Sequence, residues 1–151
     1  MGPGLNYTSA GLDSMLFMYF LDATNPDFHR LSVRIFEQLM SQKAALYTSI
    51  ISVLETLSFP KLYHLPDKVE SYHLFFKTCR GLTIEPVDEP VSLAAAGLRR
   101  RHPSLKTPDS IQLATAIIHQ AGCFITNDDR LKNITPLPFP ILTLKSLAFK
   151  N

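Results

Sequence analysis

The sequence predicts an α/β fold in which a central, mostly parallel sheet is covered by helices on both faces. Short apolar segments with the properties of buried strands alternate along the chain with longer segments of helical periodicity. Strands that are apolar over both faces are typical of parallel sheets enclosed between two layers of helix. The chain has 151 residues, enough to bury one core, and no repeat or linker divides it. We therefore expect a single domain over residues 1–151.

Five short segments have the composition of buried strands. They are Ala10–Leu12, Ala45–Ile50, Leu82–Val87, Cys123–Thr126 and Ile141–Leu144. The expected helices are Ser14–Leu21, Phe28–Met40, Ser52–Ser58, Pro66–Cys79, Glu89–His102 and one within the stretch Leu105–Ile118. The last of these helices is strongly apolar and is expected at the centre of the domain, with Thr107 as its cap and Pro108 at its first position.

The composition excludes several classes of protein. Hydrophobic residues make up 46% of the chain and charged residues 19%, which excludes general disorder. The net charge of +2 does not by itself indicate a nucleic-acid-binding protein. Cys79 and Cys123 are predicted to be reduced thiols. The longest apolar run, Met15–Leu21, is far shorter than the roughly 20 residues of a membrane span. We expect a cytoplasmic protein without a membrane partner.

Four acidic residues are expected at the same edge of the predicted sheet. Asp13 follows the first strand, and Asp128 comes shortly after the fourth. Glu55 lies early in the helix after the second strand, and Asp109 lies in the first turn of the apolar helix. Sites in open parallel sheets form outside the carboxyl ends of the strands. Carboxylates gathered there would repel one another unless a hard cation such as Mg²⁺ or Mn²⁺ offset their charge.

Each acid also has a purely structural interpretation. Ser52 and Glu55 have the spacing of a helix capping box. Asp13 could be a turn residue at the end of a strand. Asn127 and Asp128 could cap a short helix that follows them. The acid at the start of the apolar helix could stabilise the positive end of that helix dipole. Four such coincidences at one edge are less plausible than a shared site.

Four segments, taken in order, resemble the motifs of PIN-domain ribonucleases, especially toxins of the VapC type. They are Leu12-Asp13-Ser14, Thr48–Glu55, Thr107–Ala116 and Phe124–Asp128. The resemblance implies a three-layer α/β/α PIN-like fold with a central, mostly parallel sheet of four to five strands. It also implies an endoribonuclease that depends on Mg²⁺ or Mn²⁺, acts on RNA, forms a homodimer and pairs with a small antitoxin protein.

The resemblance assigns roles to particular residues. The metal-binding and catalytic acids are Asp13, Glu55, Asp109 and Asp128. The expected supporting residues are Ser14, Thr126, Asn127 and Asp129. The family spacing favours Asp128 over Asp129 as the fourth acid. Gly11 departs from the apolar residue that is usual in the first strand. Hydrolysis would use a water molecule activated by the cation, without a covalent intermediate.

A basic run comes directly before the apolar helix. It consists of Arg99, Arg100, Arg101, His102 and Lys106. Its arginines and Lys106 could form the rim of an RNA groove that contacts phosphates. The same residues could instead complement the negative end of the preceding helix dipole.

Two other functions remain open at the level of sequence. The first is a non-catalytic PIN-like module that binds RNA or a partner protein. The second is a phospho-acceptor receiver-like domain, for which Lys145 follows the last strand, although the expected pair of acids after the first strand is missing. The apolar segments Met15–Leu21 and Phe28–Met40 carry more apolar surface than a small domain easily buries. We expect part of that surface to contact a second copy or an antitoxin.

Overall fold

The computed structural model describes residues 5–148, and these residues contain a parallel sheet of five strands. The order of the strands across the sheet is β3-β2-β1-β4-β5, with β1 at the centre. Their bounds are β1 (Ser9–Leu12), β2 (Ala45–Ser49), β3 (Leu82–Glu85), β4 (Phe124–Thr126) and β5 (Ile141–Thr143). Every neighbouring pair is parallel, so the carboxyl ends of all the strands lie at one edge.

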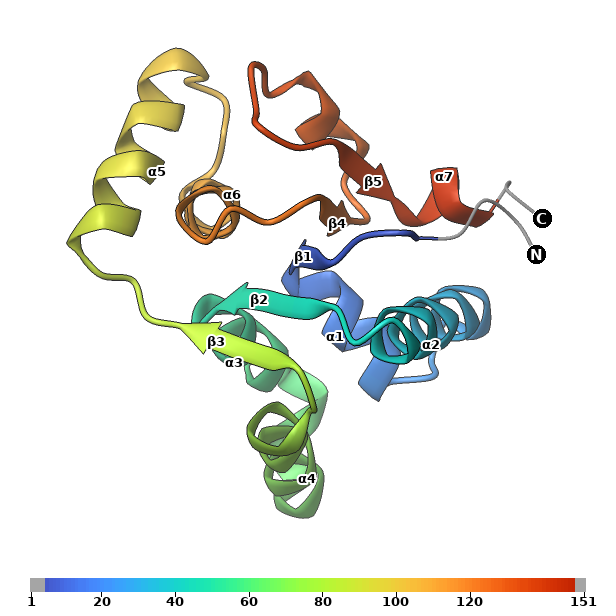
Figure 1. Cartoon of the computed structure of the whole chain (residues 1–151). Helices are drawn as coiled ribbons and strands as arrows, with labels where there is room; N and C mark the ends of the chain where they lie inside the picture. The colour runs from blue at the N-terminus through green and yellow to red at the C-terminus, as the bar shows by residue number, and fades with distance from the viewer. Residues whose placement is uncertain (1–4, 149–151) are drawn as a thin grey trace.

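Helices cover both faces of the sheet and make a three-layer α/β/α fold (Figure 1). One face carries α1 (Ser14–Leu21), α2 (Pro26–Ser41), α3 (Ile51–Leu57) and α4 (Pro66–Thr78). The other face carries α5 (Glu89–Arg101) and α6 (Thr107–Ile118). The shorter helices are η1 (Pro60–His64), η2 (Asp129–Asn133) and α7 (Leu144–Ala148). The predicted fold class is confirmed.

Each face of the sheet has its own apolar core. Phe17, Phe36 and Phe76 pack together under α1, α2 and α4. Leu98 and Leu113 join α5 to α6 on the opposite face. Successive side chains of a strand point to opposite faces of the sheet, so one strand contributes to both cores. On β4, Ile125 packs in the core under α1, α2 and α4, and Phe124 packs in the core under α5 and α6. No helix of the described residues is long and apolar enough to cross a membrane.

The helices and strands occur where the sequence predicts them, with small shifts at their ends. One detail of the prediction is wrong. Thr107 does not cap α6, because the cap position belongs to Lys106, which makes no side-chain capping bond. The last residue of α6, Ile118, is exposed. The helices η1 and α7 were not predicted, because they are too short for helical periodicity to reveal.

Gly11 allows α6 to approach the centre of the sheet. A Cβ atom added to Gly11 would lie 2.7 Å from the Cβ of Ala116 on α6 and 2.9 Å from the Cδ2 of Phe124 on β4. Both distances are far shorter than a normal contact between carbon atoms. The absence of an apolar side chain at this position therefore brings β1 and α6 together, and these two elements bring Asp13 and Asp109 to the same edge.

We predict that Gly11→Ala lowers the free energy of unfolding by about 1–3 kcal/mol, because the added methyl group overpacks a buried contact. Urea unfolding measures this change. Gly97→Ala on α5 is the matched control, since its nearest new contact is the flexible Nη2 of Arg100 at 3.6 Å. That variant should gain about 0.5–1 kcal/mol, because alanine favours a helix over glycine. A Gly11→Ala protein as stable as the parent would contradict this account of the packing.

Candidate functional site

The carboxyl edge of the sheet brings together the elements that carry the four predicted acids. Asp13 follows β1 and is the N-cap of α1, and Asp128 follows β4 and is the N-cap of η2. Asp109 lies in the first turn of α6, which begins at the same edge. Glu55 lies on α3, directly after β2. Ser14 links the side chains of Asp13 and Glu55, and the charges of neighbouring acids raise the pKa values of Asp13 and Asp109.

Asp13 is the most buried of the four acids, with only 5% of its surface exposed. The Thr126 hydroxyl donates to its Oδ2 at 2.7 Å, and the backbone N–H of Ser14 donates to its Oδ1 at 2.8 Å. Burial nevertheless raises the pKa of Asp13 from 3.8 to about 6, and the charges of Asp109 and Glu55 add to this effect. The hydrogen bonds from Thr126 and Ser14 offset only part of it.

Ser14 joins Asp13 to Glu55. Its hydroxyl donates to the Oε1 of Glu55 at 3.0 Å and lies 3.5 Å from the Oδ1 of Asp13. The capping-box interpretation of Ser52 and Glu55 is wrong, because Ile50 holds the cap position of α3 and Ser52 lies inside the helix. Glu55 is therefore available to the edge of the sheet rather than bonded to its own helix terminus.

Asp109 experiences the charges of two other acids. Burial raises its pKa, and the carboxylates of Asp128 and Glu55 raise it further. The positive charges of Arg130 and Lys106 act in the opposite direction. Because Asp13 also responds to Asp109 and Glu55, the four carboxylates form one interacting group.

The two members of the acidic doublet face different partners. The guanidinium of Arg130 grips both carboxylate oxygens of Asp128, with its shortest hydrogen bonds from Nε to Oδ1 at 2.9 Å and from Nη2 to Oδ2 at 2.7 Å. The hydrogen bond from the Arg130 side chain is the main reason why the pKa of Asp128 is lowered. Asp129 instead pairs with Lys132 at 3.6 Å and Lys145 at 3.4 Å. Of the two acids of the doublet, Asp128 is the one whose charge raises the pKa of Asp109.

Of the remaining predicted residues, Asn127 and Arg99 are held by hydrogen bonds, and the others are exposed basic residues. Asn127 donates to the hydroxyl of Tyr19 at 3.1 Å, and its buried Oδ1 has no hydrogen-bond partner within residues 5–148. Arg99 donates to the carbonyl of Leu105 at 3.0 Å and so closes the loop between α5 and α6. Arg100, Arg101 and Lys106 are exposed, and Lys106 acts on the pKa of Asp109.

The donor set at this edge consists of carboxylate and hydroxyl oxygens, which suits a hard divalent cation better than zinc. Burial and mutual repulsion leave Asp13 and Asp109 with raised pKa values, and a bound cation would relieve both effects. Over the described part of the chain, however, no three His, Cys, Asp or Glu side chains stand close enough together to share one ion. Joint coordination would therefore require rotation of the carboxylate side chains.

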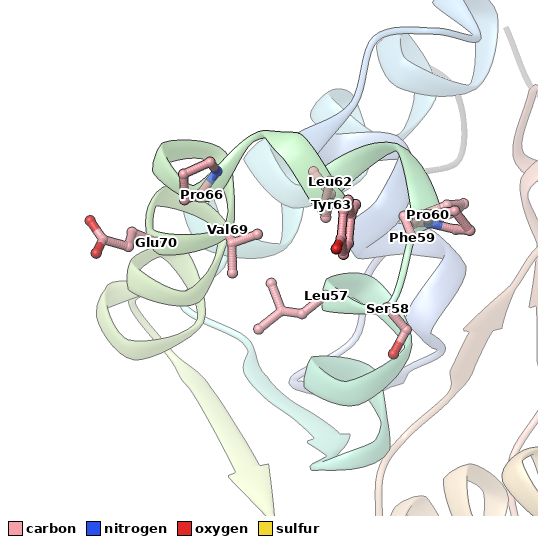
Figure 2. Close-up of a pocket in the computed structure, with 9 residues that line it drawn as sticks. All are labelled: Leu57, Ser58, Phe59, Pro60, Leu62, Tyr63, Pro66, Val69 and Glu70. Atoms are coloured by element: carbon pink, nitrogen blue, oxygen red, sulfur yellow. The ribbon is translucent and has the colours of Figure 1, made fainter.

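A separate hollow of about 500 Å³ lies between the end of α3, η1 and the start of α4. Figure 2 shows the side chains of Leu57, Tyr63 and Val69 around it. None of the four acids lines this hollow. It is mainly apolar, and it is distinct from the acidic edge of the sheet.

The fold and the acidic edge together define a class of protein, the parallel α/β domains that gather carboxylates outside their strand ends. The model of the PIN domain family matches residues 11–135. The chain therefore belongs to the PIN domain family. No curated protein matches the sequence significantly.

Solved structures share the fold at low sequence identity. A chain of VapBC2 from Rickettsia felis bound to promoter DNA matches with a TM-score of 0.66 and 14% identity, over 89% of this chain and 98% of that one. A chain of FitAcB from Neisseria gonorrhoeae matches with a TM-score of 0.60 and 21% identity, over 91% and 98%. A chain of a toxin–antitoxin complex from Klebsiella pneumoniae matches with a TM-score of 0.59 and 20% identity, over 88% and 99%.

Two residues that bear on the acidic edge are not among the predicted site residues. Arg130 bonds to Asp128, and an arginine two residues after an N-cap acid can reach back to it. Gln112 lies on α6 with only 2% of its surface exposed. Its signal in the sequence was an amide one helical turn after Asp109, in an otherwise apolar helix.

We predict that Asp13 makes the metal-free protein less stable as the pH rises from about 4 to about 7. The pKa of Asp13 is raised in the fold from 3.8 to about 6, so the protonated carboxyl favours folding. Its contribution is complete below pH 3.8 and is lost as the pH rises through 6, which corresponds to roughly 3 kcal/mol. Urea unfolding with EDTA should show a shallower decline for Asp13→Asn. Parallel curves for the two proteins would exclude this role of Asp13.

Proposed function

We propose that this chain is an endoribonuclease of the VapC type that depends on Mg²⁺ or Mn²⁺ and acts as the toxin of a toxin–antitoxin pair. PIN domains are generally nucleases, and PIN nucleases typically use divalent metal ions. The observation that carries the proposal is the interacting group of Asp13, Glu55, Asp109 and Asp128 at the carboxyl edge of the sheet. Acids whose pKa values are raised by burial and by neighbouring carboxylates, as those of Asp13 and Asp109 are, are typical of functional sites.

In this proposal the four acids hold the cation, and their hydroxyl partners orient them. Thr126 orients Asp13, and Ser14 fixes the distance between Asp13 and Glu55. When bound, a divalent cation would activate a water nucleophile and stabilise negative charge on the scissile phosphate. Asp128 would have to exchange its bonds with Arg130 for the cation, and the released guanidinium would remain beside the site as a phosphate-binding group.

The exposed basic residues at the junction of α5 and α6 are the proposed RNA rim. Arg100 and Arg101 end α5, and Lys106 precedes α6 close enough to lower the pKa of Asp109. Phosphates held by these side chains would lie beside the acidic edge. Arg99 contributes less in this proposal, because it is engaged with the carbonyl of Leu105.

An antitoxin partner is supported by the structural similarity of this chain to a chain of a toxin–antitoxin complex from Klebsiella pneumoniae. The predicted partner surface lies on Met15–Leu21 and Phe28–Met40. Of the exposed large hydrophobic side chains in the described residues, only Met40 falls within these segments. Several others lie on or beside α3, η1 and α4, among them Leu54, Tyr63 and Leu74. We therefore move the proposed partner surface, for an antitoxin or a second copy, to α3, η1 and α4.

The alternative is a PIN-like module that binds RNA or a partner protein without cleaving RNA. Two observations favour it: Arg130 already neutralises Asp128, and the carboxylates are not arranged to share one ion as they stand. The receiver-like alternative is set aside, because the chain belongs to the PIN domain family.

We predict that Asp13→Asn, Glu55→Gln and Asp109→Asn each reduce the rate of cleavage of a structured RNA by more than about 100-fold. Loss of a residue that only supports a metal ligand costs up to roughly 100-fold, and loss of a ligand should cost more. Each variant removes a charge that the cation needs. The measurement is RNA cleavage with Mg²⁺, with Mn²⁺ and with EDTA.

The matched control is Asp129→Asn, whose carboxylate pairs with Lys132 and Lys145 rather than with the acidic group. It should be milder than Asp128→Asn. Full activity in a well-folded Asp109→Asn preparation would refute the nuclease proposal. Absence of any cleavage by the parent protein under all three conditions would favour the binding module.

A further inference from the structure

A buried polar network surrounds the side-chain amide of Gln112 on α6. The Oε1 of Gln112 accepts from the backbone N–H of Ser49 at 3.1 Å, and its Nε2 donates to the hydroxyl of Ser52 at 2.8 Å. The hydroxyls of Ser52 and Thr48 share a hydrogen bond of 2.6 Å, and Thr48 donates to the carbonyl of Leu12 at 2.8 Å. All of these side chains are almost completely buried. Burial of so many polar atoms is costly unless each is bonded.

The network has one consistent direction of donation. Ser49 supplies an N–H, so the atom of Gln112 that faces it must be the carbonyl oxygen, and the amide nitrogen must face Ser52. The Thr48 hydroxyl has one proton and two possible acceptors, the carbonyl of Leu12 at 2.8 Å and the Oε1 of Gln112 at 3.4 Å. Either acceptor uses that proton, so Ser52 donates to Thr48, and the shorter distance assigns the proton to Leu12. A continuous chain of donors therefore runs from Gln112 through Ser52 and Thr48 to Leu12. Chains of this kind are strengthened by mutual polarisation.

The network joins elements that lie next to three of the four acids. Its end on β1, Leu12, directly precedes Asp13. Its member on α3, Ser52, lies one helical turn before Glu55. Gln112 itself lies one helical turn after Asp109 on α6. Apolar packing alone would allow these elements to slide or rotate slightly, whereas directional bonds fix their relative positions.

We propose that Gln112 is a positioning residue that sets the spacing of Asp13, Glu55 and Asp109 for joint binding of a divalent cation. This inference rests on the proposed function, because it concerns the same acidic edge. Gln112 makes no contact with these carboxylates and acts through Ser52, Thr48 and Leu12. Loss of the Gln112 amide removes none of the acids, but it allows β1, α3 and α6 to shift slightly relative to one another. The distances between the acids are then less restricted, and the affinity of a metal site depends strongly on such supporting bonds.

The test compares Gln112→Met with Thr115→Val in the full chain. Methionine has nearly the length of glutamine but cannot complete the network. Thr115 lies on the same helix, is buried to the same degree, and donates within the helix to the carbonyl of Ile111 at 2.8 Å. Both variants should lose some thermal stability in EDTA. Only Gln112→Met should weaken Mn²⁺ binding, by about 10–100-fold in the dissociation constant measured by electron paramagnetic resonance.

Equal Mn²⁺ affinities for Gln112→Met and the parent protein would overturn the positioning role, as would equal losses of affinity in Gln112→Met and Thr115→Val. If Gln112→Met does not fold, Ser52→Ala removes the middle of the chain of donors and must give the same selective loss. Asp109→Asn separates the two proposals. A parent protein that binds Mn²⁺ no better than Asp109→Asn overturns the metal site itself. A parent that binds better than Asp109→Asn but equally to Gln112→Met overturns only the role of Gln112.

Discussion

Repulsion among carboxylates at the carboxyl edge of the sheet is the constraint on which the rest of this structure depends. Two charges about 5 Å apart repel by roughly 3 kcal/mol at an effective dielectric constant of about 20. The fold must offset this repulsion at the edge of the sheet, where Glu55 raises the pKa values of both Asp13 and Asp109. Burial is the main reason why the pKa of Asp13 is raised to about 6, and the charges of Asp109 and Glu55 add to this effect. In the proposed function, a divalent cation bound at this edge would relieve both effects.

The fold itself supplies the partial compensation. Thr126 and the backbone of Ser14 stabilise the charge on Asp13, while Ser14 also bonds to Glu55. Asp109 lies in the first turn of α6, where the helix dipole favours an anion. Arg130 neutralises Asp128 directly. Ser14 contacts two of the acids, and the charge of Arg130 acts on both Asp128 and Asp109, yet the pKa values of Asp13 and Asp109 remain raised.

The fold could be predicted from the sequence because its elements have strong and different periodicities. The amphipathic helix α2 places Ile35, Phe36 and Leu39 in the core as its spacing requires. The short strands are apolar over both faces because helices cover both. Prediction failed where local signals were weak. The helix α6 begins without a side-chain cap, so Thr107 was misjudged, and η1 spans too few residues for a periodic pattern.

The positions of the acids could be predicted because parallel strands must bring their carboxyl ends to one edge. The bonds that hold the acids could not. A glutamine in an apolar helix is typical of a solvent-facing stripe, and its burial depends on the β2–α3 turn, more than sixty residues earlier in the sequence. Ser52 similarly matched a capping box, because its true partners, Thr48 and Gln112, become neighbours only in the folded sheet.

The most direct test of the account is anomalous X-ray diffraction from crystals of the parent protein grown with Mn²⁺. The account predicts a manganese peak among the carboxylates of Asp13, Glu55 and Asp109, with their side chains rotated toward it. The same crystals should show whether Asp128 has left Arg130. The absence of any peak at the carboxyl edge, at a Mn²⁺ concentration that supports RNA cleavage, would contradict the central claim.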